Sequence, residues 1–343
     1  MKPARNIQDK ITQPEFRKQL LAWYDAHARD LPWRKSRDPY RVWVSEIMLQ
    51  QTRVAAVIEH YHAFLRRFPT VQRLAAAREA SVLAAWSGLG YYRRARMLHA
   101  ASKVIACERS GMFPQTAAEW QKLPGVGRYT AAAVASIAFG ERVAVVDGNV
   151  ERVLQRIVGK AISGEPVWNC AENLLDHERP GDFNQAVMEL GATVCTPRSP
   201  ACLTCPVMGM CVSRGELAAG TKAARQQKRE IHYALHRRNG SVFLVQRPRD
   251  ARLMAGMWEL PEIIPPRDRD KPLFRMKHSI TITDYTVEIW AAPQPAEVPG
   301  QWCTLERLPR LALTGLARKV LRRGGIFPAS GRPVNSSTVG GRL

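Results

Sequence analysis

The segment LPGVGRYTAAAVASIAFG, residues 123–140, decides the fold of this 343-residue chain. Gly125 and Gly127 bracket a tight turn that ends one helix and opens another. Backbone N–H groups at the start of the second helix can face outward, and this arrangement binds phosphate. A glycine pair alone is usually only a turn, but here a helix of small residues follows at once in a strongly basic chain. Residues 122–140 therefore predict a helix–hairpin–helix element that contacts a polyanion.

The overall charge favours the same kind of partner. The chain has 51 Lys and Arg residues against 30 Asp and Glu, which gives a net charge of +21 and a pI of about 10.2. This surplus favours nucleic acid over a merely basic soluble protein or a membrane-surface binder. No apolar run approaches the roughly 18 residues that span a bilayer, and residues 1–16 lack the apolar core of a secretory signal. We expect a cytoplasmic, nucleoid-associated protein that is not secreted and binds no membrane.

The chain divides into a large helical part and a smaller mixed part. From about residue 11 to residue 214, apolar residues recur at helical spacing between short Pro and Gly turns, as in residues 44–68. Residues 215–229 are polar and basic and predict a linker. Residues 230–327 contain strand-like runs and a short closing helix, and the Gly-, Ser- and Pro-rich residues 328–343 predict a disordered tail. The fold class is therefore mainly α, with an α+β domain behind the helices.

Four of the seven cysteines lie in one short loop, residues 195–211, with the spacing C-x6-C-x2-C-x5-C. Four thiolates in one loop can enclose a metal ion or an iron–sulfur cluster. Zinc is the serious rival, although a zinc ribbon usually has two C-x2-C pairs and only one pair is that close here. The candidate ligands are Cys195, Cys202, Cys205 and Cys211.

Two carboxylates carry candidate chemistry. Glu46 lies in the otherwise apolar helical turn VSEIMLQQ, where its neighbours should desolvate the carboxyl, raise its pKa and keep a proton available near neutrality. Asp147 follows an apolar run in AVVDGNVERVL. The alternative reading of Asp147 is a cap on the helix that begins near Asn149. Both roles are compatible only if the Asp147 carboxylate is partly free.

The ordered motifs resemble those of the helix–hairpin–helix DNA glycosylase superfamily with an iron–sulfur loop, and are most similar to the adenine DNA glycosylases of the MutY type. The resemblance is continuous from about residue 23 to residue 211 and weaker beyond. It implies a two-lobed helical glycosylase domain holding one 4Fe–4S cluster, followed by a Nudix-like domain over residues 230–327. The motifs, in order, are LPWR, SEIMLQQT, GLGYYRRARML, LPGVGRYTA, VDGNVERVL, FNQAVMELGA and the four cysteines.

The resemblance implies a monomeric enzyme that acts on double-stranded DNA. It would flip out an adenine mispaired with 8-oxoguanine or guanine and hydrolyse its N-glycosidic bond. Glu46 matches the acid that protonates adenine N7. Asp147 matches the carboxylate that stabilises the oxocarbenium-like sugar or bonds to it transiently, and Tyr129 and Asn149 match the residues that position this carboxylate and the water. Tyr129 stands where bifunctional relatives such as endonuclease III carry a lysine, so we expect a monofunctional glycosylase that leaves an abasic site.

The resemblance also assigns contacts with DNA and with the extruded base. Gln51 matches the side chain wedged into the base stack, and Tyr91 matches the ring inserted beside the oxidised guanine. The other expected DNA contacts are Arg93, Arg94, Arg96, Gly125, Gly127, Arg128 and Arg198. The expected lining of the adenine pocket is Trp33, Arg34, Gln185 and Met188, with core packing as an equal alternative for Trp33 and Met188.

The C-terminal part departs from the family in two places. LMAGMWELPE, residues 253–262, is its strongest match, but Ile263 and Ile264 follow where a working Nudix hydrolase has glutamates that hold divalent metal. We therefore expect no pyrophosphatase activity. The family recognises 8-oxoguanine through a Phe-Ser-His loop, and the segment KHSITIT lacks the histidine at that place. The expected substitutes are His278, Ser279 and Thr281, with weaker selectivity for 8-oxoguanine over guanine.

Two other functions stay open at this point. A glycosylase of the same fold could remove another mismatched base, such as thymine opposite guanine, although close relatives with that activity usually lack the C-terminal domain. A noncatalytic DNA-binding protein would use the hairpin and the cysteine loop only for backbone contacts. Glu46, Tyr129 and Asp147 together argue against the second alternative, because a protein that only binds DNA needs no buried acid.

Overall fold

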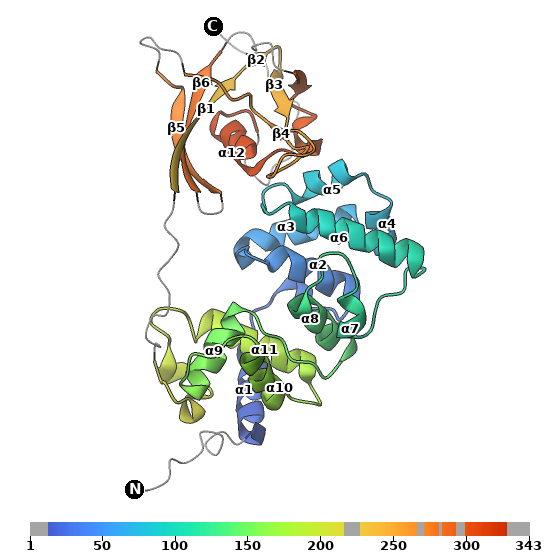
Figure 1. Ribbon diagram of the computed structural model, residues 1–343, viewed down its shortest axis with the longest axis vertical. Coiled ribbons are helices and arrows are strands. Elements are labelled where there is room, and N and C mark those ends of the chain that lie inside the picture. The colour runs from blue at the N-terminus through green and yellow to red at the C-terminus, as the bar shows by residue number, and fades with distance from the viewer. Residues whose placement is uncertain (1–12, 216–226, 266–270, 281–282, 293–298, 328–343) are drawn as a thin grey trace. The chain divides into compact units, whose positions relative to one another are not determined.

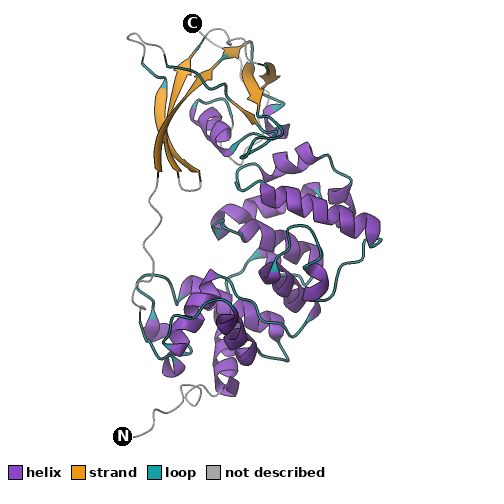
Figure 2. Ribbon diagram, in the orientation of Figure 1, coloured by secondary structure: helices purple, strands orange, loops and turns teal. Residues whose placement is uncertain are grey.

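The computed structural model forms two compact units, one built from residues 1–76 and 96–221 and the other from residues 77–95 and 222–343. The first unit is helical, and the second contains every strand of the described residues (Figure 2). The sequence places residues 77–95 inside the helical domain, whereas in the structure they pack with the C-terminal unit. The structure describes residues 13–215, 227–265, 271–280, 283–292 and 299–327.

The first unit consists of helices joined by turns and longer loops (Figure 1). The long stretch that is predicted as helical over residues 44–68 is broken into two helices, because Gln51 adopts a left-handed backbone with φ of 54°. Helix α6 begins in the second unit and continues in the first. The helices are α1 Gln13–His27, α2 Pro39–Leu49, α3 Val54–Arg67, α4 Val71–Ala75, α6 Arg93–Lys103, α7 Ala117–Trp120, α8 Arg128–Phe139, α9 Gly148–Val158, α10 Glu165–Leu174 and α11 Pro180–Thr193.

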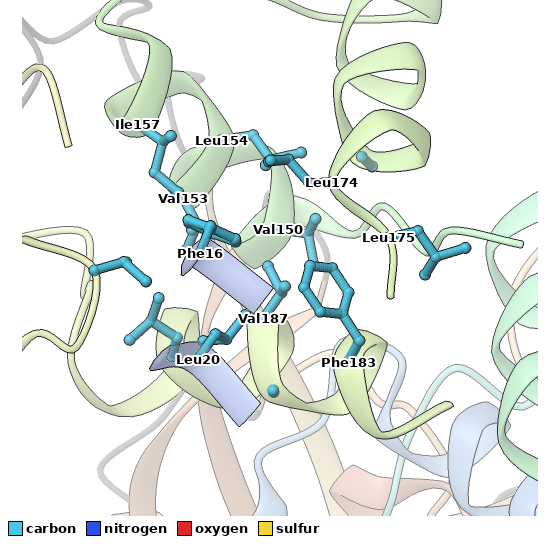
Figure 3. Close-up of a cluster of buried hydrophobic side chains, with 14 of the residues drawn as sticks. Phe16, Leu20, Val150, Val153, Leu154, Ile157, Leu174, Leu175, Phe183 and Val187 are labelled. Atoms are coloured by element: carbon cyan, nitrogen blue, oxygen red, sulfur yellow. The ribbon is translucent and has the colours of Figure 1, made fainter. Parts of the chain in front are cut away.

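One apolar core joins the beginning of the described chain to the helices near the cysteine loop (Figure 3). Phe16 and Leu20 of α1 pack in the same cluster as Val150 of α9 and Phe183 of α11. Burying an apolar side chain of this size stabilises a fold by about 1.5–3 kcal/mol. The packing therefore fixes α9, which Asp147 precedes.

The predicted hairpin lies between α7 and α8. Gly125 has φ of +73°, and a Cβ atom there would lie 2.3 Å from Cβ of Met97. Gly127 precedes α8 with φ of −88°, and nothing lies within 4 Å of the Cβ that it lacks. Residues 130–136 of α8 are small or β-branched and buried, and this permits α8 to pack closely with α2.

The described residues of the second unit form two small sheets and two complete α-helices. The helices are α5 Glu79–Trp86 and α12 Gly315–Arg323. In one sheet the strand order is β1-β6-β5, with β1 parallel and β5 antiparallel to β6. In the other, β3 lies between β2 and β4 and also pairs with β7. Apolar residues of both sheets and of α12 share one core. The strands are β1 Gln227–Leu235, β2 Arg237–Arg238, β3 Ser241–Gln246, β4 Trp258–Glu259, β5 Phe274–Ile280, β6 Thr283–Ala291 and β7 Gly300–Thr304.

One sequence-based boundary differs from the structure. The predicted linker over residues 215–229 is wrong at its end, because β1 already begins at Gln227. Among the expected strand-like runs, β5 and β6 form an antiparallel pair in which Ile280 pairs with Thr283. Residues 216–226 of the linker and the predicted disordered tail lie outside the described residues. No helix in the described ranges is long and apolar enough to cross a bilayer.

The two hairpin glycines should respond differently to alanine. Gly125→Ala forces a left-handed backbone and a clash with Met97, so we expect a loss of about 2 kcal/mol or more in the free energy of unfolding. Gly127→Ala has open space and an ordinary φ and serves as the matched control. Urea unfolding followed by the helical circular dichroism signal measures both. Equal stability of the two variants would contradict the role given to Gly125.

Candidate active site

Helix α2 carries Glu46 into the interior of the first unit, where the residue is only 6% exposed. Tyr129, in the first turn of α8, donates its hydroxyl to Oε2 of Glu46 at 2.7 Å. One turn further along, the Gln50 amide donates to the Thr130 hydroxyl at 3.1 Å. Two adjacent residues of α8 are thus bonded to α2, and the hairpin that precedes α8 sets the position of the Glu46 partner.

Burial governs the electrostatics of this pair. It raises the pKa of Glu46 to about 7, with a further rise from the charge of Asp147, while the Tyr129 hydrogen bond and Arg34 lower it. Burial also raises the pKa of Tyr129 well above its ordinary value. A raised pKa at Glu46 is what the apolar sequence around it predicts. Near neutral pH, a substantial fraction of Glu46 therefore carries a proton, and Tyr129 remains a neutral phenol.

Asp147 is the N-cap of α9, as the structural alternative required. Its Oδ1 atom accepts the backbone N–H groups of Asn149 at 2.8 Å and of Val150 at 2.7 Å. Its Oδ2 atom accepts the Asn149 side-chain amide at 3.1 Å, and the residue stays partly exposed. The helix N-terminus stabilises negative charge at this point. A cap and a partly free carboxylate therefore coexist in one residue.

The Asn149 amide is oriented by Arg152. Nη2 of Arg152 donates to Oδ1 of Asn149 at 2.9 Å and to the Gly191 carbonyl at 2.7 Å. Because arginine only donates, the amide nitrogen of Asn149 must face Asp147. A Cβ at Gly191 would lie 2.8 Å from Cβ of Asn149, so a glycine in α11 permits this close approach. Nε of Arg152 also donates to the Cys195 carbonyl at 2.9 Å, which connects the site to the cysteine loop.

Sequence reasoning missed Glu189, although its side chain is fully buried on α11. Burial alone would raise the pKa of Glu189, but hydrogen bonds from Arg29 and Arg34 lower it to about 2. The Arg29 contacts are 2.6 and 2.7 Å long and the Arg34 contact is 2.8 Å. Arg34, expected in the adenine pocket, is thereby held in place, and it also stacks on Tyr24 at 5.3 Å. The available signal was an acid among apolar residues in FNQAVMELGA, the same signal that singled out Glu46.

Asn184 of α11 is a second residue that sequence reasoning missed. It is buried, and its amide donates to the Ser136 hydroxyl and to the Val143 carbonyl, each at 2.9 Å. Its Oδ1 atom accepts the Val145 N–H at 3.1 Å. Asn184 thus ties the segment that leads to Asp147 onto α8, which carries Tyr129.

The other expected pocket residues divide into two groups. The Tyr129 hydroxyl lies 3.5 Å from the sulfur of Met188, and Met188 is partly exposed one helical turn after Gln185. Trp33 is buried in an edge contact with Tyr61, with ring centroids 5.5 Å apart. The structure thus brings Met188 to the Glu46–Tyr129 pair, whereas the contacts of Trp33 fit the core-packing alternative.

Two residues expected to insert into DNA share an unusual backbone conformation. Gln51 has φ of 54° and is exposed, and Tyr91 has φ of 47° and is 48% exposed. A left-handed backbone at a residue other than glycine costs about 1–3 kcal/mol and concentrates at functional sites. Each side chain is thus presented to solvent from a strained turn in its own unit.

The expected phosphate-binding arginines differ in their surroundings. Arg93 and Arg198 are exposed. Arg128 stacks on Trp168 at 3.9 Å and forms an ion pair with Glu165 at 2.5 Å, so its charge is already paired within the first unit.

Arg94 lies against the rings of Trp86 and Tyr91, 5.5 and 5.4 Å from their centroids. Its Nη2 atom donates to the carbonyls of Leu89 and Gly90 at 3.4 and 3.3 Å. Burial lowers the pKa of Arg94 to about 10. The contacts of Arg94 are therefore those of a residue that braces the Tyr91 loop, rather than those of a side chain extended toward phosphate.

Two of the residues expected to recognise 8-oxoguanine, His278 and Ser279, belong to β5. The Ser279 hydroxyl donates to Asp284 at 2.5 Å. His278 is half-buried, and burial together with Lys319 lowers its pKa. Thr281 lies outside the described residues.

The four clustered cysteines line one pocket together with Arg156, and none of the four forms a disulfide. The loop contains two short helical turns, Cys202–Thr204 and Met208–Met210. Arg156 is buried and donates to the Cys195 sulfur at 3.3 Å and to the Thr196 carbonyl at 2.7 Å. Four sulfur donors facing one pocket, with a buried cation beside them, fit an iron–sulfur cluster with negatively charged ligands.

Comparisons with known proteins agree with this geometry. Residues 44–162 match the HhH-GPD superfamily of base excision DNA repair proteins, and residues 195–211 match the iron–sulfur binding domain of endonuclease III. The second match assigns one 4Fe–4S cluster to the four cysteines, which decides against zinc.

Individual relatives extend over more of the chain. The chain is 37% identical to the adenine DNA glycosylase of Mus musculus, over 93% of this chain and 80% of the mouse protein. It is 39% identical to the adenine DNA glycosylase of Homo sapiens, over 82% of this chain and 62% of the human protein. The solved structure of a thermostable thymine-DNA glycosylase is similar with a TM-score of 0.56 and 30% identity, covering 60% of this chain and 97% of that one.

Replacing Glu46 should change how stability depends on pH. The pKa of Glu46 rises from 4.5 to about 7 on folding, so between these values the folded chain holds a proton that the unfolded chain has lost. The free energy of unfolding therefore falls as pH rises from 4.5 to about 7, and above this range Glu46 causes no further fall. Relative to wild type, Glu46→Gln should gain up to about 3 kcal/mol between pH 5 and pH 8. Urea unfolding at both pH values measures this gain, with the exposed Glu59→Gln as control, and a pH-independent difference would refute it.

The cysteine loop should bind iron. We expect about four iron atoms per purified chain and no stoichiometric zinc, measured by elemental analysis. Cys202→Ser should lower the iron content. Cys170→Ser, which changes a partly buried thiol outside the loop, should leave it unchanged. One zinc ion per chain in place of iron would overturn the assignment.

Proposed function

Because the chain belongs to the adenine DNA glycosylase family, we propose that it removes adenine mispaired with 8-oxoguanine or guanine and leaves an abasic site. The observation that carries this proposal is the pairing of buried Glu46 with Tyr129, under the influence of the Asp147 charge. A glycosidic bond needs both a proton for the leaving group and negative charge for the sugar. These groups supply both within one helical unit.

Glu46 supplies the proton. Its Oε2 atom is occupied by the Tyr129 hydroxyl, so the acidic proton resides on Oε1. Transfer of this proton to N7 of an extruded adenine makes the base a better leaving group, and the electrons of the breaking N-glycosidic bond remain with the base. A pKa of about 7 matches an acid that works near neutral pH.

Asp147 stabilises the positive charge that develops on the sugar. Its Oδ1 atom is held by two backbone donors of α9, and Oδ2 accepts a hydrogen bond from the Asn149 amide. The carboxylate therefore needs little reorganisation when the charge appears, which is the source of electrostatic stabilisation. Water then adds to the sugar C1′ and its proton passes to the Glu46 carboxylate, which restores the acid and completes the hydrolysis.

Tyr129 limits the reaction to hydrolysis. Strand cleavage by a bifunctional glycosylase needs an amine that forms a Schiff base with the sugar. The side chain at this place is a phenol whose pKa is raised well above its ordinary value, so it neither forms a Schiff base nor becomes an anion. The abasic strand should remain intact until alkali breaks it.

The remaining features support DNA binding. The open space at Gly127 permits the backbone N–H groups at the start of α8 to approach a phosphate. The 4Fe–4S cluster orders the loop that exposes Arg198 and takes no part in the hydrolysis. We propose that Tyr91, from its strained turn, inserts beside the base opposite the adenine, and that the β5–β6 pair with Ser279 and His278 contributes to reading 8-oxoguanine.

The decisive assay uses three labelled duplexes that contain A opposite 8-oxoguanine, A opposite guanine and T opposite guanine. We expect strand breaks at both adenines only after alkali treatment, and none at thymine. Glu46→Gln should reduce the single-turnover rate by about 10²–10⁴-fold while leaving duplex binding within about twofold. The exposed Glu59→Gln variant is the matched control and should keep the wild-type rate.

Each outcome of this assay separates the alternatives. Breaks before alkali would show lyase activity and refute the role given to Tyr129. Breaks at thymine alone would favour the thymine mismatch activity that the name of the solved relative carries. Binding without any break would favour a noncatalytic protein. Normal cutting by Glu46→Gln would show that the acid is assigned wrongly.

A further inference from the structure

The loop that carries Tyr91 is bonded to the C-terminal domain. This loop, residues 87–92, joins α5 to α6 and lies within the helical part of the sequence, yet it belongs to the second unit. Ser87 donates its hydroxyl to the Leu313 carbonyl at 2.8 Å, and Tyr92 donates its hydroxyl to the same carbonyl at 3.2 Å. Both side chains are buried. Two residues that flank Tyr91 thus converge on one carbonyl more than 200 residues away in sequence.

Arg318 of α12 adds a further bond to this contact. We call the bonds that join Ser87 and Tyr92 to Leu313 and Arg318 the clamp. Its Nε atom donates to the Ser87 hydroxyl at 2.9 Å, so Ser87 accepts a bond from Arg318 and donates one to Leu313. Arg318 is half-buried and stacks on Phe327 at 5.0 Å. An ionised donor strengthens a hydrogen bond in a partly dry environment. The order of donation is therefore Arg318 to Ser87 to the Leu313 carbonyl.

The C-terminal side of the clamp is itself rigid. Thr314 caps α12 through a bond from the Ala317 N–H at 3.1 Å, and its own N–H donates to the Trp258 carbonyl at 2.9 Å. The Trp258 N–H donates to the Ala312 carbonyl at 2.8 Å. Residues 312–314 are thus bonded to β4 on both sides of Leu313, whose carbonyl presents a fixed acceptor to the loop.

The clamp bears on Tyr91 because the turn that carries this residue is strained. A left-handed backbone at a residue other than glycine persists only where several surrounding contacts hold it in that conformation. Arg94 braces the turn from within, through the carbonyls of Leu89 and Gly90. Ser87 and Tyr92 hold the two ends of the loop against α12 and the segment before it.

We propose that Arg318 is a positioning residue through which the C-terminal domain fixes the Tyr91 loop and thereby strengthens recognition of the base opposite the target adenine. The link to recognition rests on the proposed function, whereas the ordering of the loop does not. This would give the C-terminal domain an effect on lesion recognition that needs no contact of its own with the lesion.

The chain offers a matched pair of variants. Arg318 and Arg322 both lie on α12 and both stack on Phe327, at 5.0 and 5.9 Å. Arg318 also bonds to the loop, through the Ser87 hydroxyl. Arg318→Ala and Arg322→Ala therefore remove similar stacking and differ in the clamp. Arg318→Lys keeps a cationic donor, and Ser87→Ala breaks the clamp from the loop side without touching α12.

The first measurement is amide hydrogen exchange of residues 87–92 in the full chain without DNA. We expect at least fivefold faster exchange in Arg318→Ala and in Ser87→Ala, partial recovery in Arg318→Lys, and the wild-type rate in Arg322→Ala. Exchange in α12 should stay slow in every variant. Wild-type exchange in both clamp variants would overturn the proposal, and Ser87→Ala keeps it testable if Arg318→Ala fails to fold.

The second measurement is binding to duplexes that carry a noncleavable adenine analogue opposite 8-oxoguanine or opposite guanine. We expect Arg318→Ala to lose at least fivefold in the ratio of the two dissociation constants, and Arg322→Ala to keep the wild-type ratio. Faster loop exchange with an unchanged ratio would refute the link to recognition while leaving the clamp in place. If wild type prefers neither duplex over a matched one, the proposed function fails, and the exchange result still decides the clamp.

Discussion

The arrangement of the site depends on the burial of one carboxyl group, Glu46, which raises its pKa to about 7. A carboxyl at the surface would be ionised at neutral pH, so Glu46 has to be desolvated, and it also has to be held by a donor that never becomes an anion. Tyr129 is such a donor, because it is buried beside Glu46 and stays a neutral phenol, while burial outweighs the lowering of the Glu46 pKa by its hydrogen bond. The close packing of α8 on α2 makes the contact possible, and it follows from the small residues of α8 and from the glycine that turns the chain before it.

The second carboxylate is built on a different principle, since backbone donors hold it in position. Asp147 uses one oxygen to cap α9, and the other faces the Asn149 amide. Arg152 orients this amide and also bonds to the carbonyl of Cys195, so the loop that holds the cluster is part of the scaffold around Asp147. Glu189 likewise fixes the position of a second arginine, Arg34, through a hydrogen bond. The charge of Arg34 lowers the pKa of Glu46. The site is thus a set of opposed charges whose positions are fixed from several helices.

Much of this arrangement was predictable from the sequence because it depends on local patterns. The hairpin, the helical domain, the cysteine loop and the strands behind them follow from turn residues, periodicity and spacing. The break between α2 and α3 was not predictable from the sequence, because Gln51 takes a backbone conformation that its residue type does not favour. Arg94 was expected at phosphate, and its stacking on two rings depends on how the loop folds back. The packing of residues 77–95 with the C-terminal unit depends on bonds to Leu313 and Arg318, and no local pattern contains such distant partners.

The ion pair between Arg128 and Glu165 has a consequence for how the hairpin attracts DNA. The arginine beside the turn that we expect to bind phosphate already faces a carboxylate and an indole ring, so it contributes little unpaired positive charge. Only cations that displace condensed counterions make affinity fall steeply with salt. At the hairpin, the oriented N–H dipoles at the start of α8 and the exposed Lys122 then contribute to the attraction beside Arg128. The large positive charge of the chain would act elsewhere along the duplex and would account for most of the salt sensitivity.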